Sequence, residues 1–525
     1  MTGSPTGGNV RRSEGPLGVR EFELADRVRG ILNRHPSVGL AIGVVVAGRL
    51  EFFHAHGLAD IASNTRVSAD TVFRIASVTK TFTAIAVMQL WEQGLIDLDA
   101  PANDYLRAYK LIPAEASFRP ATVRHLLTHT AGIREVLHLS GLLRMRDLGE
   151  TVRIGRPVPS LAEYYGGGLR IDVEPGTRFM YTDHGFATLG QIVEDVSGEP
   201  LDRYLREHIF EPLGMGSTDL VRSERVTSHL ATGYELRPRG AEPVPEYEVI
   251  TIGGGGIYSP PRDMARYLAA LLGEGENEYG SVLKPETLAT MFEPQFQPDP
   301  RIPGIGLAFF RAHLAGHLAL EHDGILPGFD SEILLAPDDG VGVMAFANGA
   351  RRAMHWLVPE VEGLLRDLLE VPGEAIRTQV PQHPEIWADL CGYYRFSAHP
   401  SDPARFAIGP GVEVVVRRGR LMIRALSPVP ALYRGLVLHP DDEEDPYAFR
   451  IEVPWFGTSR VVFSRQPGVG TTALHLDVAP MSFQKHPLST SPRSRAAGAL
   501  GALATGAAAV ALGRRCRGSH GEEQT

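Results

Sequence analysis

Residues 82–95 carry apolar side chains on nearly every face of a predicted helix. A helix that is apolar all round is normally buried in a protein core, and Gly94 near the far end is typical of a helix stop. We therefore expect a central, buried helix here. Its apolar positions are Phe82, Ile85, Val87, Met88, Leu90, Trp91 and Leu95.

Strand patterns precede this helix. The segments Val38–Val46 and Leu50–Gly57 have strand patterns on either side of a turn at 47–49, which predicts a β-hairpin. An extended segment, Thr71–Ile75, then leads directly into the helix. Sheet and helix therefore alternate early in the chain.

Helical patterns and polar loops dominate residues 100–250, for example at Thr122–Leu127 and Phe186–Val196. Strand patterns return between Leu307 and Phe346, and a helix is expected at Met354–Leu369. This order predicts an α/β (α+β) fold with a sheet flanked by helices and a mainly helical lobe. The expected late strands are Leu318–His322, Ser331–Ala336 and Val341–Ala347.

The chain changes character after residue 370. Residues 371–386 contain three prolines and few large apolar residues, which indicates a linker. Short strand patterns then alternate with turns over residues 387–486 and predict a small all-β barrel or sandwich, which we interpret as a lid or contact domain. Its expected strands are Tyr393–Phe396, Val412–Arg417, Leu421–Ala425, Tyr447–Val453 and Ser459–Ser464.

Both ends of the chain are expected to lie outside these domains. Residues 1–20 are rich in Gly, Ser, Pro and Arg, lack the apolar run of a secretory signal, and predict a flexible, uncleaved, cytoplasmic start. The main domain then spans 21–370. The tail, 487–525, contains an uncharged Ala- and Gly-rich run at 496–513 between arginines, and a weak membrane anchor is the alternative to a flexible tail.

Composition narrows the classes of partner. The chain has 525 residues, 43% hydrophobic and 22% charged, and is long enough for a full core. A net charge of −10 offers no basic face for nucleic acid, so we expect no nucleic-acid partner. Cys391 and Cys516 are too few for a disulfide framework and lack metal-site spacing. We expect no metal and no organic cofactor.

Ser77 and Lys80 lie three residues apart where the buried helix begins. Residues i and i+3 share a face of a helix, so the hydroxyl and the amine project side by side. The unpaired backbone N–H groups of a first helical turn can stabilise a developing oxyanion. A serine hydroxyl needs a neighbouring base to become a nucleophile. The S-x-x-K spacing alone is common by chance, so further motifs are needed.

Further motifs follow in order. Tyr181-Thr182-Asp183 and His322-Asp323-Gly324 come after Ser77-Val78-Thr79-Lys80, and together they resemble the S-x-x-K, Y-x-N and K-T-G or H-x-G signatures of the β-lactamase-related serine hydrolases. That family includes class C β-lactamases, penicillin-binding-protein-like esterases and D-aminopeptidases. The opening of the second domain, residues 390–394, resembles a lipocalin-like domain that some members append. Other agreeing stretches are 73–77, 124–133, 211–215 and 254–259.

The resemblance implies a β-lactamase/transpeptidase-like fold and a role for each matching residue. Ser77 would be the nucleophile that forms an acyl-enzyme, with Lys80 and Tyr181 handling its proton. Tyr181 is the expected immediate base, because a nearby Lys80 ammonium would favour its phenolate. The oxyanion would lie between the backbone N–H groups of Ser77 and Ile325.

The chain departs from the family's pattern at two places. Asp183 stands where asparagine is usual, and its charge would keep Lys80 protonated. His322-Asp323 replaces Lys-Thr and removes the cation that would bind a substrate carboxylate. With Asp183, His322, Asp323 and Gly324 as the substrate-binding residues, we expect a small-molecule carboxylic ester as substrate. Alternatives are a D-aminopeptidase or amidase, a β-lactamase-like peptidase, or a catalytically weak binding or sensor protein.

Several residues invite other interpretations. His184 could belong to a Ser-His-Asp triad, but Ser77 lacks the G-x-S-x-G elbow of such enzymes. His125 and His129 are expected to be packed or hydrogen-bonded structural residues. The glycines at 253–256 lack the context of a phosphate loop, so we expect them to form a closely packed wall of the cleft.

Overall fold

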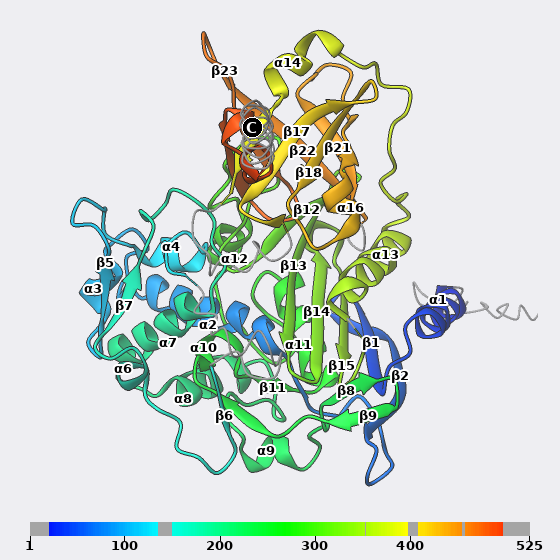
Figure 1. The fold of residues 1–525 in the computed structure, drawn as a ribbon. Helices are drawn as coiled ribbons and strands as arrows, with labels where there is room; N and C mark the ends of the chain where they lie inside the picture. The colour runs from blue at the N-terminus through cyan, green and yellow to red at the C-terminus, as the bar shows by residue number, and fades with distance from the viewer. Residues whose placement is uncertain (1–19, 135–149, 352, 397–407, 454–456, 497–525) are drawn as a thin grey trace, which may run out of the picture.

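The computed structural model describes residues 20–134, 150–351, 353–396, 408–453 and 457–496. Two bodies of structure are visible in Figure 1, a large one with a central sheet and a smaller all-β one above it. The run at 496–513 lies almost entirely outside the described residues. Within the described part of the chain, no helix is both long enough and apolar enough to cross a membrane.

The large body is built on a seven-stranded antiparallel sheet in the order β12-β13-β14-β15-β1-β2-β3. The expected hairpin and the three late strands are all present. The first and last parts of this body meet where β1 pairs with β15, from Leu40 opposite Ala347 to Val46 opposite Val341. The strands are β12 (Phe310–Leu314), β13 (His317–Leu326), β14 (Phe329–Ala336), β15 (Val341–Ala347), β1 (Gly39–Val46), β2 (Arg49–Asp60) and β3 (Thr65–Arg66).

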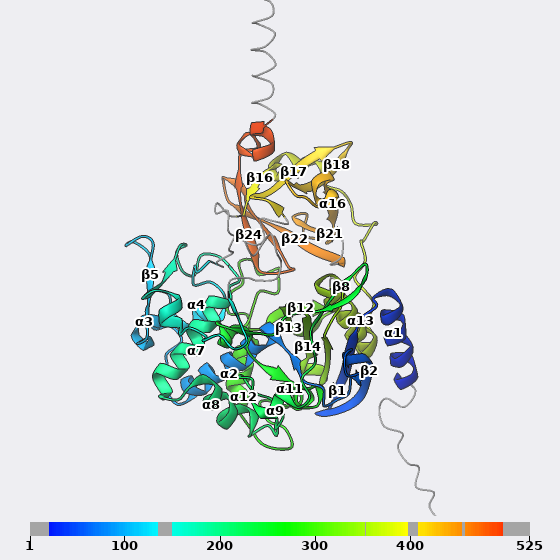
Figure 2. The same cartoon turned by 60° about the horizontal axis from the view of Figure 1, so that its bottom comes forward.

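Helices cover both faces of this sheet, as Figures 1 and 2 show. On one face α1 and α13 enclose a core that contains Val28, Val343 and Leu364. The other face packs against the helical lobe, whose centre is α2. The helices are α1 (Arg20–Arg34), α2 (Thr79–Glu92), α3 (Ala102–Tyr105), α4 (Val123–Leu127), α6 (Leu161–Tyr164), α7 (Asp183–Ser197), α8 (Leu201–Leu205), α9 (Glu224–Thr227), α10 (Ile252–Gly255), α11 (Pro261–Leu272), α12 (Pro285–Phe292) and α13 (Leu357–Leu369).

The prediction of a buried central helix is confirmed. Eleven of the fourteen residues of α2 are buried, including the threonines and Lys80. The helix ends before Gly94, which adopts φ +71°. Glycine is favoured at a left-handed position just after a helix.

Short strand pairs complete the large body. They are β4 (Phe73–Arg74) with β11 (Tyr258–Ser259), β5 (Lys110–Pro113) with β7 (Gly168–Ile171), β6 (Thr151–Arg153) with β10 (Tyr247–Val249), and β8 (Tyr234–Arg237) with β9 (Gly240–Pro243).

The smaller body is one nine-stranded sheet, in the order β19-β18-β17-β16-β24-β23-β22-β21-β20, which curls into a nearly closed barrel. All five predicted strands are present, and four further strands escaped prediction. The strands are β16 (Gly392–Arg395), β17 (Gly411–Arg417), β18 (Arg420–Ala425), β19 (Leu436–Val437), β20 (His439–Pro440), β21 (Ala448–Val453), β22 (Gly457–Gln466), β23 (Gly470–Leu476) and β24 (Met481–His486), with short helices α14 (Trp387–Leu390) and α16 (Pro430–Arg434).

Polar contacts join the two bodies. Arg301 of the large body donates to the Asp445 carboxylate (2.9 Å) and to the carbonyl oxygen of Phe463 (2.9 Å). Arg178, three residues before Tyr181, donates to the carbonyl oxygen of Phe396 (3.1 Å). The smaller body is therefore fixed next to the chain segment that carries Tyr181.

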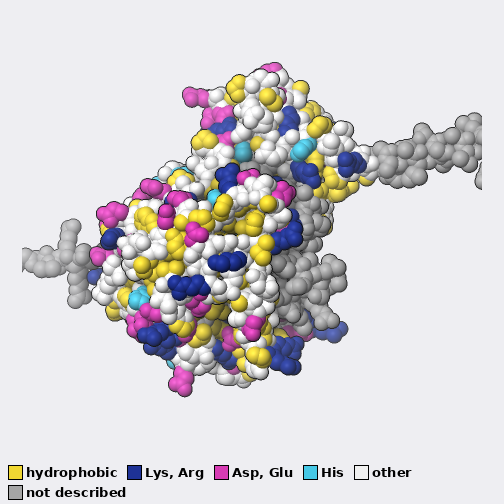
Figure 3. Space-filling model, turned by 90° about the vertical axis from the view of Figure 1, so that its left-hand side faces the viewer, with side chains coloured by type: hydrophobic (Ala, Val, Ile, Leu, Met, Phe, Trp, Pro, Cys, Tyr) yellow, Lys and Arg dark blue, Asp and Glu magenta, His cyan; other side chains and the backbone are white. Residues whose placement is uncertain are grey.

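The surface carries both signs of charge. On the described part of the face in Figure 3, Lys and Arg side chains are interspersed with Asp and Glu side chains. That face therefore has no continuous basic patch of the kind that binds nucleic acid.

Candidate active site

Ser77 lies in a short 3-10 turn, η1 (Ala76–Val78), immediately before α2. The preceding residue, Ala76, has φ +49°, which is unfavourable for a residue with a Cβ. Two hydrogen bonds hold the turn: Ser331 Oγ donates to Ile75 O (2.7 Å), and Ile75 N donates to Ile257 O (3.1 Å). Local strain of this kind concentrates at functional sites, where surrounding structure enforces it.

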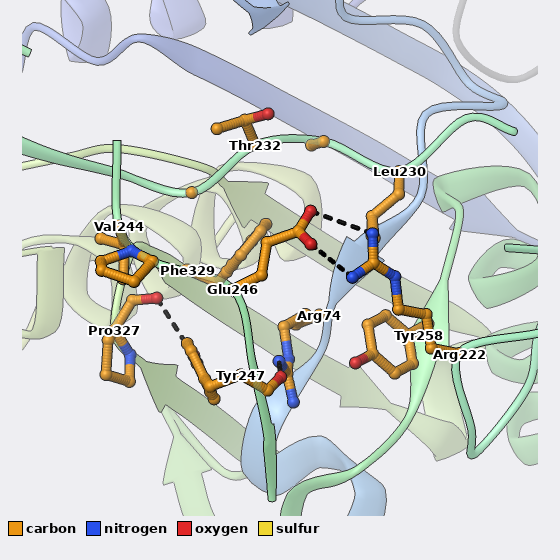
Figure 4. A pocket seen from close by; sticks show the side chains of 13 residues that line it. Arg74, Arg222, Leu230, Thr232, Val244, Glu246, Tyr247, Tyr258, Pro327 and Phe329 are labelled. Atoms are coloured by element: carbon orange, nitrogen blue, oxygen red, sulfur yellow. Dashed lines mark hydrogen bonds and ion pairs between the residues drawn. The ribbon is translucent and has the colours of Figure 1, made fainter. Parts of the chain in front are cut away.

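Arg74 anchors the strand that leads into this turn. Its guanidinium lies between the rings of Tyr247 (4.3 Å) and Tyr258 (4.8 Å) and donates to Tyr247 O (2.6 Å), as Figure 4 shows. These residues line a pocket in which Arg222 pairs with Glu246. Cation–π contacts of a buried arginine are each worth about 1–2 kcal/mol, so β4 is held firmly before Ser77.

Lys80 is completely buried beneath Ser77. Its Nζ donates to Ser77 Oγ (2.9 Å), to the carbonyl oxygen of Gly254 (2.7 Å) and to the Asp183 carboxylate. An ammonium has three N–H donors, and Tyr181 is a further hydrogen-bonding neighbour of the same group. The predicted pairing of hydroxyl and amine on one helix face is present, and Asp183 is brought to it from the start of α7.

The electrostatics of Lys80 favour the charged form. Burial lowers the pKa of Lys80, but Asp183 and Tyr181 outweigh burial and hold the pKa above its usual value. The Asp183 side chain keeps 31% of its surface exposed, whereas Lys80 exposes none. Lys80 is therefore held in its charged form, which disfavours it as the base for Ser77, as expected from the Asp183 charge.

Tyr181 lies above this ammonium, just before α7. Lys80 Nζ is 4.9 Å from the centre of the Tyr181 ring. Burial raises the pKa of the Tyr181 phenol, and Lys80 opposes that rise without cancelling it. The phenol is therefore neutral at rest, and a phenolate forms only as a minor species whose population grows with pH.

Gly324 of β13 lies against η1, and the ring of His322, two residues earlier, has its centroid 6.5 Å from that of Tyr181. A Cβ at Gly324 would lie 2.4 Å from Ile75 O and 3.0 Å from the Ala76 side chain, so only glycine permits this approach. The approach brings the backbone of the next residue, Ile325, beside the turn that carries Ser77. Ile325 pairs in register with Asp330 of β14.

The His322 imidazole is buried and neutral. Nδ1 donates to Asp323 O (2.7 Å), which leaves Nε2 as an acceptor, and Nε2 is buried with no hydrogen-bond partner among the described residues. Burial, reinforced by Lys80, lowers the pKa of His322 to about 3. The ring therefore offers a substrate a lone pair rather than a positive charge.

The Asp323 side chain lies on the other face of β13 from His322 and Gly324, although its charge still raises the pKa of Tyr181 and Lys80 lowers the pKa of Asp323. Successive residues of a strand point to opposite faces of the sheet, and Asp323 pairs with Glu332 on the face away from Ser77. There it joins a set of acidic residues that we call the back-face carboxyls, which are Glu321, Asp323, Asp330 and Glu332.

Burial raises the pKa of each of the back-face carboxyls. Burial raises the pKa of Glu321 to about 8 and that of Asp330 to about 7, with Asp323 adding to both shifts. Glu332 is 0% exposed, and burial with the neighbouring carboxyls holds its pKa well above the usual value. Neither of its side-chain oxygens has a hydrogen-bond partner among the described residues.

Glu332→Gln is expected to stabilise the protein at alkaline pH. A folded-state pKa above the unfolded value means that the wild type loses stability as pH rises past the unfolded pKa, about 4.3, because ionisation favours the unfolded chain. Glutamine does not ionise, so its advantage should be absent at pH 4 and amount to about 1–3 kcal/mol at pH 8. Melting temperatures at both pH values test this, with exposed Glu286→Gln as the control. A lower melting temperature for Glu332→Gln at pH 8 would contradict the assignment.

Two alternatives from the sequence are resolved by position. His184 has its Nδ1 bonded to the Tyr165 hydroxyl (3.0 Å) and its Nε2 3.3 Å from Glu150, so its ring does not serve Ser77. His125 caps α4 by accepting from Thr122 N (3.2 Å). The glycines at 253–256 do pack closely, and Gly254 O has the additional role of accepting from Lys80.

The Beta-lactamase family model matches residues 24–358 of this chain. The chain belongs to the β-lactamase family. Members of that family act as serine hydrolases, and this chain is an enzyme of that class. Penicillin-binding protein 4 of Amycolatopsis lactamdurans is 27% identical over 369 residues, 68% of this chain and 91% of that protein. Esterase EstB of Burkholderia gladioli is 30% identical over 268 residues, 45% and 65% of the two chains.

Two solved structures extend the likeness to the smaller body. The octameric penicillin-binding protein homologue from Pyrococcus abyssi aligns with 88% of this chain and 99% of its own, with a TM-score of 0.57 at 22% identity. SurE aligns with 89% of this chain and 99% of its own, with a TM-score of 0.59 at 22% identity. At this identity the likeness concerns the fold, and it includes the curled sheet after residue 386.

A pH shift is expected from Asp183→Asn in this β-lactamase-family site. The Asp183 charge raises the pKa of both Lys80 and Tyr181. Its removal therefore lets the phenol, or the amine, lose its proton at lower pH. If Tyr181 acts as a phenolate, kcat should rise with pH as the phenol ionises, and we call this rise the alkaline-rising limb. In Asp183→Asn its midpoint should shift to lower pH by about one unit, since one unit corresponds to about 1.4 kcal/mol of interaction.

The matched control is Asp195→Asn, near the other end of α7, where the carboxylate accepts from Arg107 N (2.6 Å). It should leave the limb in place. An unmoved limb in Asp183→Asn would mean that neither Lys80 nor Tyr181 limits the rate through its ionisation.

Proposed function

We propose that this enzyme hydrolyses a small, neutral carboxylic ester through an acyl-enzyme on Ser77. The observation that carries the proposal is the 2.9 Å bond from the buried Lys80 ammonium to Ser77 Oγ, with Asp183 holding the positive charge in place. A fixed cation beside a hydroxyl stabilises the negative charge that develops as the hydroxyl loses its proton.

In this scheme Ser77 Oγ attacks the ester carbonyl while Tyr181, in its minor phenolate form, takes the Ser77 proton and passes it to the departing alcohol. Burial raises the pKa of the phenol and Lys80 opposes that rise, so Lys80 supports the phenolate that acts as the base. Water then cleaves the acyl-serine bond and releases the carboxylic acid. The backbone N–H groups of Ser77 and Ile325 would hold the oxyanion, and the close approach of Gly324 to η1 supports that placement.

The preference for a neutral substrate follows from the charges around Ser77. Lys80 spends its donors on Ser77, Asp183 and Gly254, and His322 is neutral. A substrate carboxylate therefore gains no free cation from either residue. This argues against β-lactams and against peptides that end in a free carboxylate.

A second candidate is an amide that bears a free amine. The unpartnered Nε2 of His322 is a buried acceptor, and an amine or ammonium is a donor. Among relatives of this chain, one is named a D-alanyl-D-alanine carboxypeptidase/endopeptidase, 29% identical over 262 residues, and another an esterase. Both ester and amide chemistry are therefore represented among the relatives.

Steady-state kinetics with two chromogenic substrates separate these candidates. We expect p-nitrophenyl butyrate to have a higher kcat/KM than D-alanine p-nitroanilide, with Ser77→Ala as the blank for both. Turnover of the anilide alone would reject the ester in favour of the amide. A β-lactam hydrolysed faster than either would reject the argument from charge.

A further inference from the structure

We propose that His129 is the positioning residue for Tyr181, and that it fixes the phenol over Lys80 through its ring and its backbone together. This inference rests on the proposed role of Tyr181 as the base. His129 follows α4 and lies 52 positions before Tyr181 in the chain, on a different segment of the helical lobe.

The two rings are stacked. Their centroids lie 4.3 Å apart at an interplanar angle of 29°. Stacked aromatic pairs are worth about 0.5–1.5 kcal/mol beyond the area that they bury. Lys80 Nζ lies 4.9 Å from the centre of the same Tyr181 ring, so the ring that stacks on His129 is also the ring that contacts the ammonium.

Hydrogen bonds from both chain neighbours of Tyr181 end on His129. Met180 N donates to His129 O (2.7 Å), and Thr182 N donates to His129 Nδ1 (3.3 Å). Tyr181 lies between β7 and α7, outside any named strand or helix. One residue therefore supplies the backbone restraint that a strand neighbour would otherwise give.

The backbone of His129 is itself unusual. It has φ +55° in a segment where Thr130 N donates to His125 O (2.8 Å), and its side chain is 2% exposed. A non-glycine residue in the left-handed region costs about 1–2 kcal/mol. Such strain persists only where surrounding structure enforces it, and here the left-handed turn directs the imidazole onto the Tyr181 ring.

The ring stack and the two hydrogen bonds between His129 and the Tyr181 segment, which we call the His129 clamp, require a neutral imidazole. Nδ1 can accept from Thr182 only while it carries no proton, and burial, with Lys80 and His322 adding to it, holds the pKa of His129 well below its usual value. The groups packed around the ring are Phe179, Phe186 and Tyr181, and the nearby charge is Lys80. The clamp is therefore intact across the working pH range.

The test compares His129→Phe with its wild type, using p-nitrophenyl butyrate. Phenylalanine keeps an aromatic ring but removes the acceptor for Thr182 N. A small displacement of a reacting group costs up to about 10²-fold in rate, so kcat should fall about 10- to 100-fold with little change in KM. Because Lys80 lowers the pKa of the phenol, a looser Tyr181 should also shift the alkaline-rising limb to higher pH.

His129→Asn and His125→Phe complete the design. Asparagine keeps an acceptor close to the backbone and tolerates positive φ, so its kcat should lie between those of His129→Phe and the wild type, and it carries the test if His129→Phe does not fold. His125→Phe removes the α4 cap in the same segment, so it should lower the melting temperature without moving the limb.

Tyr181→Phe separates the two possible failures. If Tyr181→Phe is inactive while a folded His129 variant keeps wild-type kcat and an unmoved limb, the inference about His129 is wrong and the role of Tyr181 stands. If Tyr181→Phe keeps wild-type kcat, the proposed role of Tyr181 is wrong, and the inference fails with it.

Discussion

Replacing Lys80 by methionine should abolish most of the activity and destabilise the fold at once. Methionine fills a similar volume without charge or donors, so Ser77 loses the cation at 2.9 Å and Tyr181 loses the charge that lowers its pKa. We expect kcat/KM for p-nitrophenyl butyrate to fall by about 10³-fold, within the usual range for loss of proton-transfer catalysis.

The stability cost has a separate cause. Removing one partner of a buried ion pair leaves the other charge uncompensated, which typically costs 3–5 kcal/mol. We expect about 3 kcal/mol here, because Asp183 keeps 31% of its side chain exposed. Calorimetric melting should register this as a drop of several degrees.

The double variant Lys80→Met/Asp183→Asn distinguishes the two effects. Asparagine removes the uncompensated charge, so melting should recover most of the loss, whereas kcat/KM should remain near that of Lys80→Met. Recovery of activity in the double variant would show that Lys80 serves only to neutralise Asp183, and its catalytic role would be rejected.

Tyr181→Phe should lower kcat by about 10²- to 10⁴-fold, the usual contribution of general acid–base catalysis. Phenylalanine retains the ring that stacks on His129 and changes only the phenolic hydroxyl, so KM and the melting temperature should change little. The residual rate should also lose its alkaline-rising limb, because no phenol remains to ionise. Stopped-flow acylation together with the pH dependence of kcat measures both effects.

Tyr109→Phe is the matched control. Its buried hydroxyl donates to Thr188 Oγ1 (2.9 Å) away from Ser77, so its loss should affect stability rather than rate. A Tyr181→Phe enzyme with a wild-type limb would assign that limb to another group, and Lys80 would then be the first candidate.

Much of the site could be predicted because it depends on local periodicity. The spacing of Ser77 and Lys80 places both on one face at a helix start, and the apolar surroundings of that helix predict the complete burial of Lys80. The family resemblance placed Asp183 beside Lys80, and from that placement the sequence predicted a charged Lys80, since a carboxylate raises the pKa of a nearby amine.

Contacts between side chains that lie far apart in the chain could not be predicted from local sequence patterns. Tyr181 follows Lys80 by 101 residues, and only the family resemblance brought the two together. The stack of His129 on Tyr181 depends on the positive φ of His129, which no sequence pattern predicts. The hydrogen bond from Lys80 to the Gly254 carbonyl could not be predicted either, because a glycine-rich stretch indicates close packing without identifying which oxygen contacts the lysine.

His322, Asp323 and Gly324 are consecutive residues of one strand, and the two-residue period of a strand puts Asp323 on the face opposite the other two. Hydrophobicity does not show which side chains of β13 face the site, because β13 is substantially buried on both faces. The same alternation of side chains places the back-face carboxyls together on one face of the sheet.

Intact-mass analysis after treatment with a fluorophosphonate tests most directly whether Ser77 is the activated nucleophile. We expect a single covalent adduct on the wild type, mapped by peptide sequencing to Ser77 and absent from folded Ser77→Ala. An adduct on another residue, an adduct that persists in Ser77→Ala, or no adduct on a folded wild type that still turns over p-nitrophenyl butyrate would contradict it.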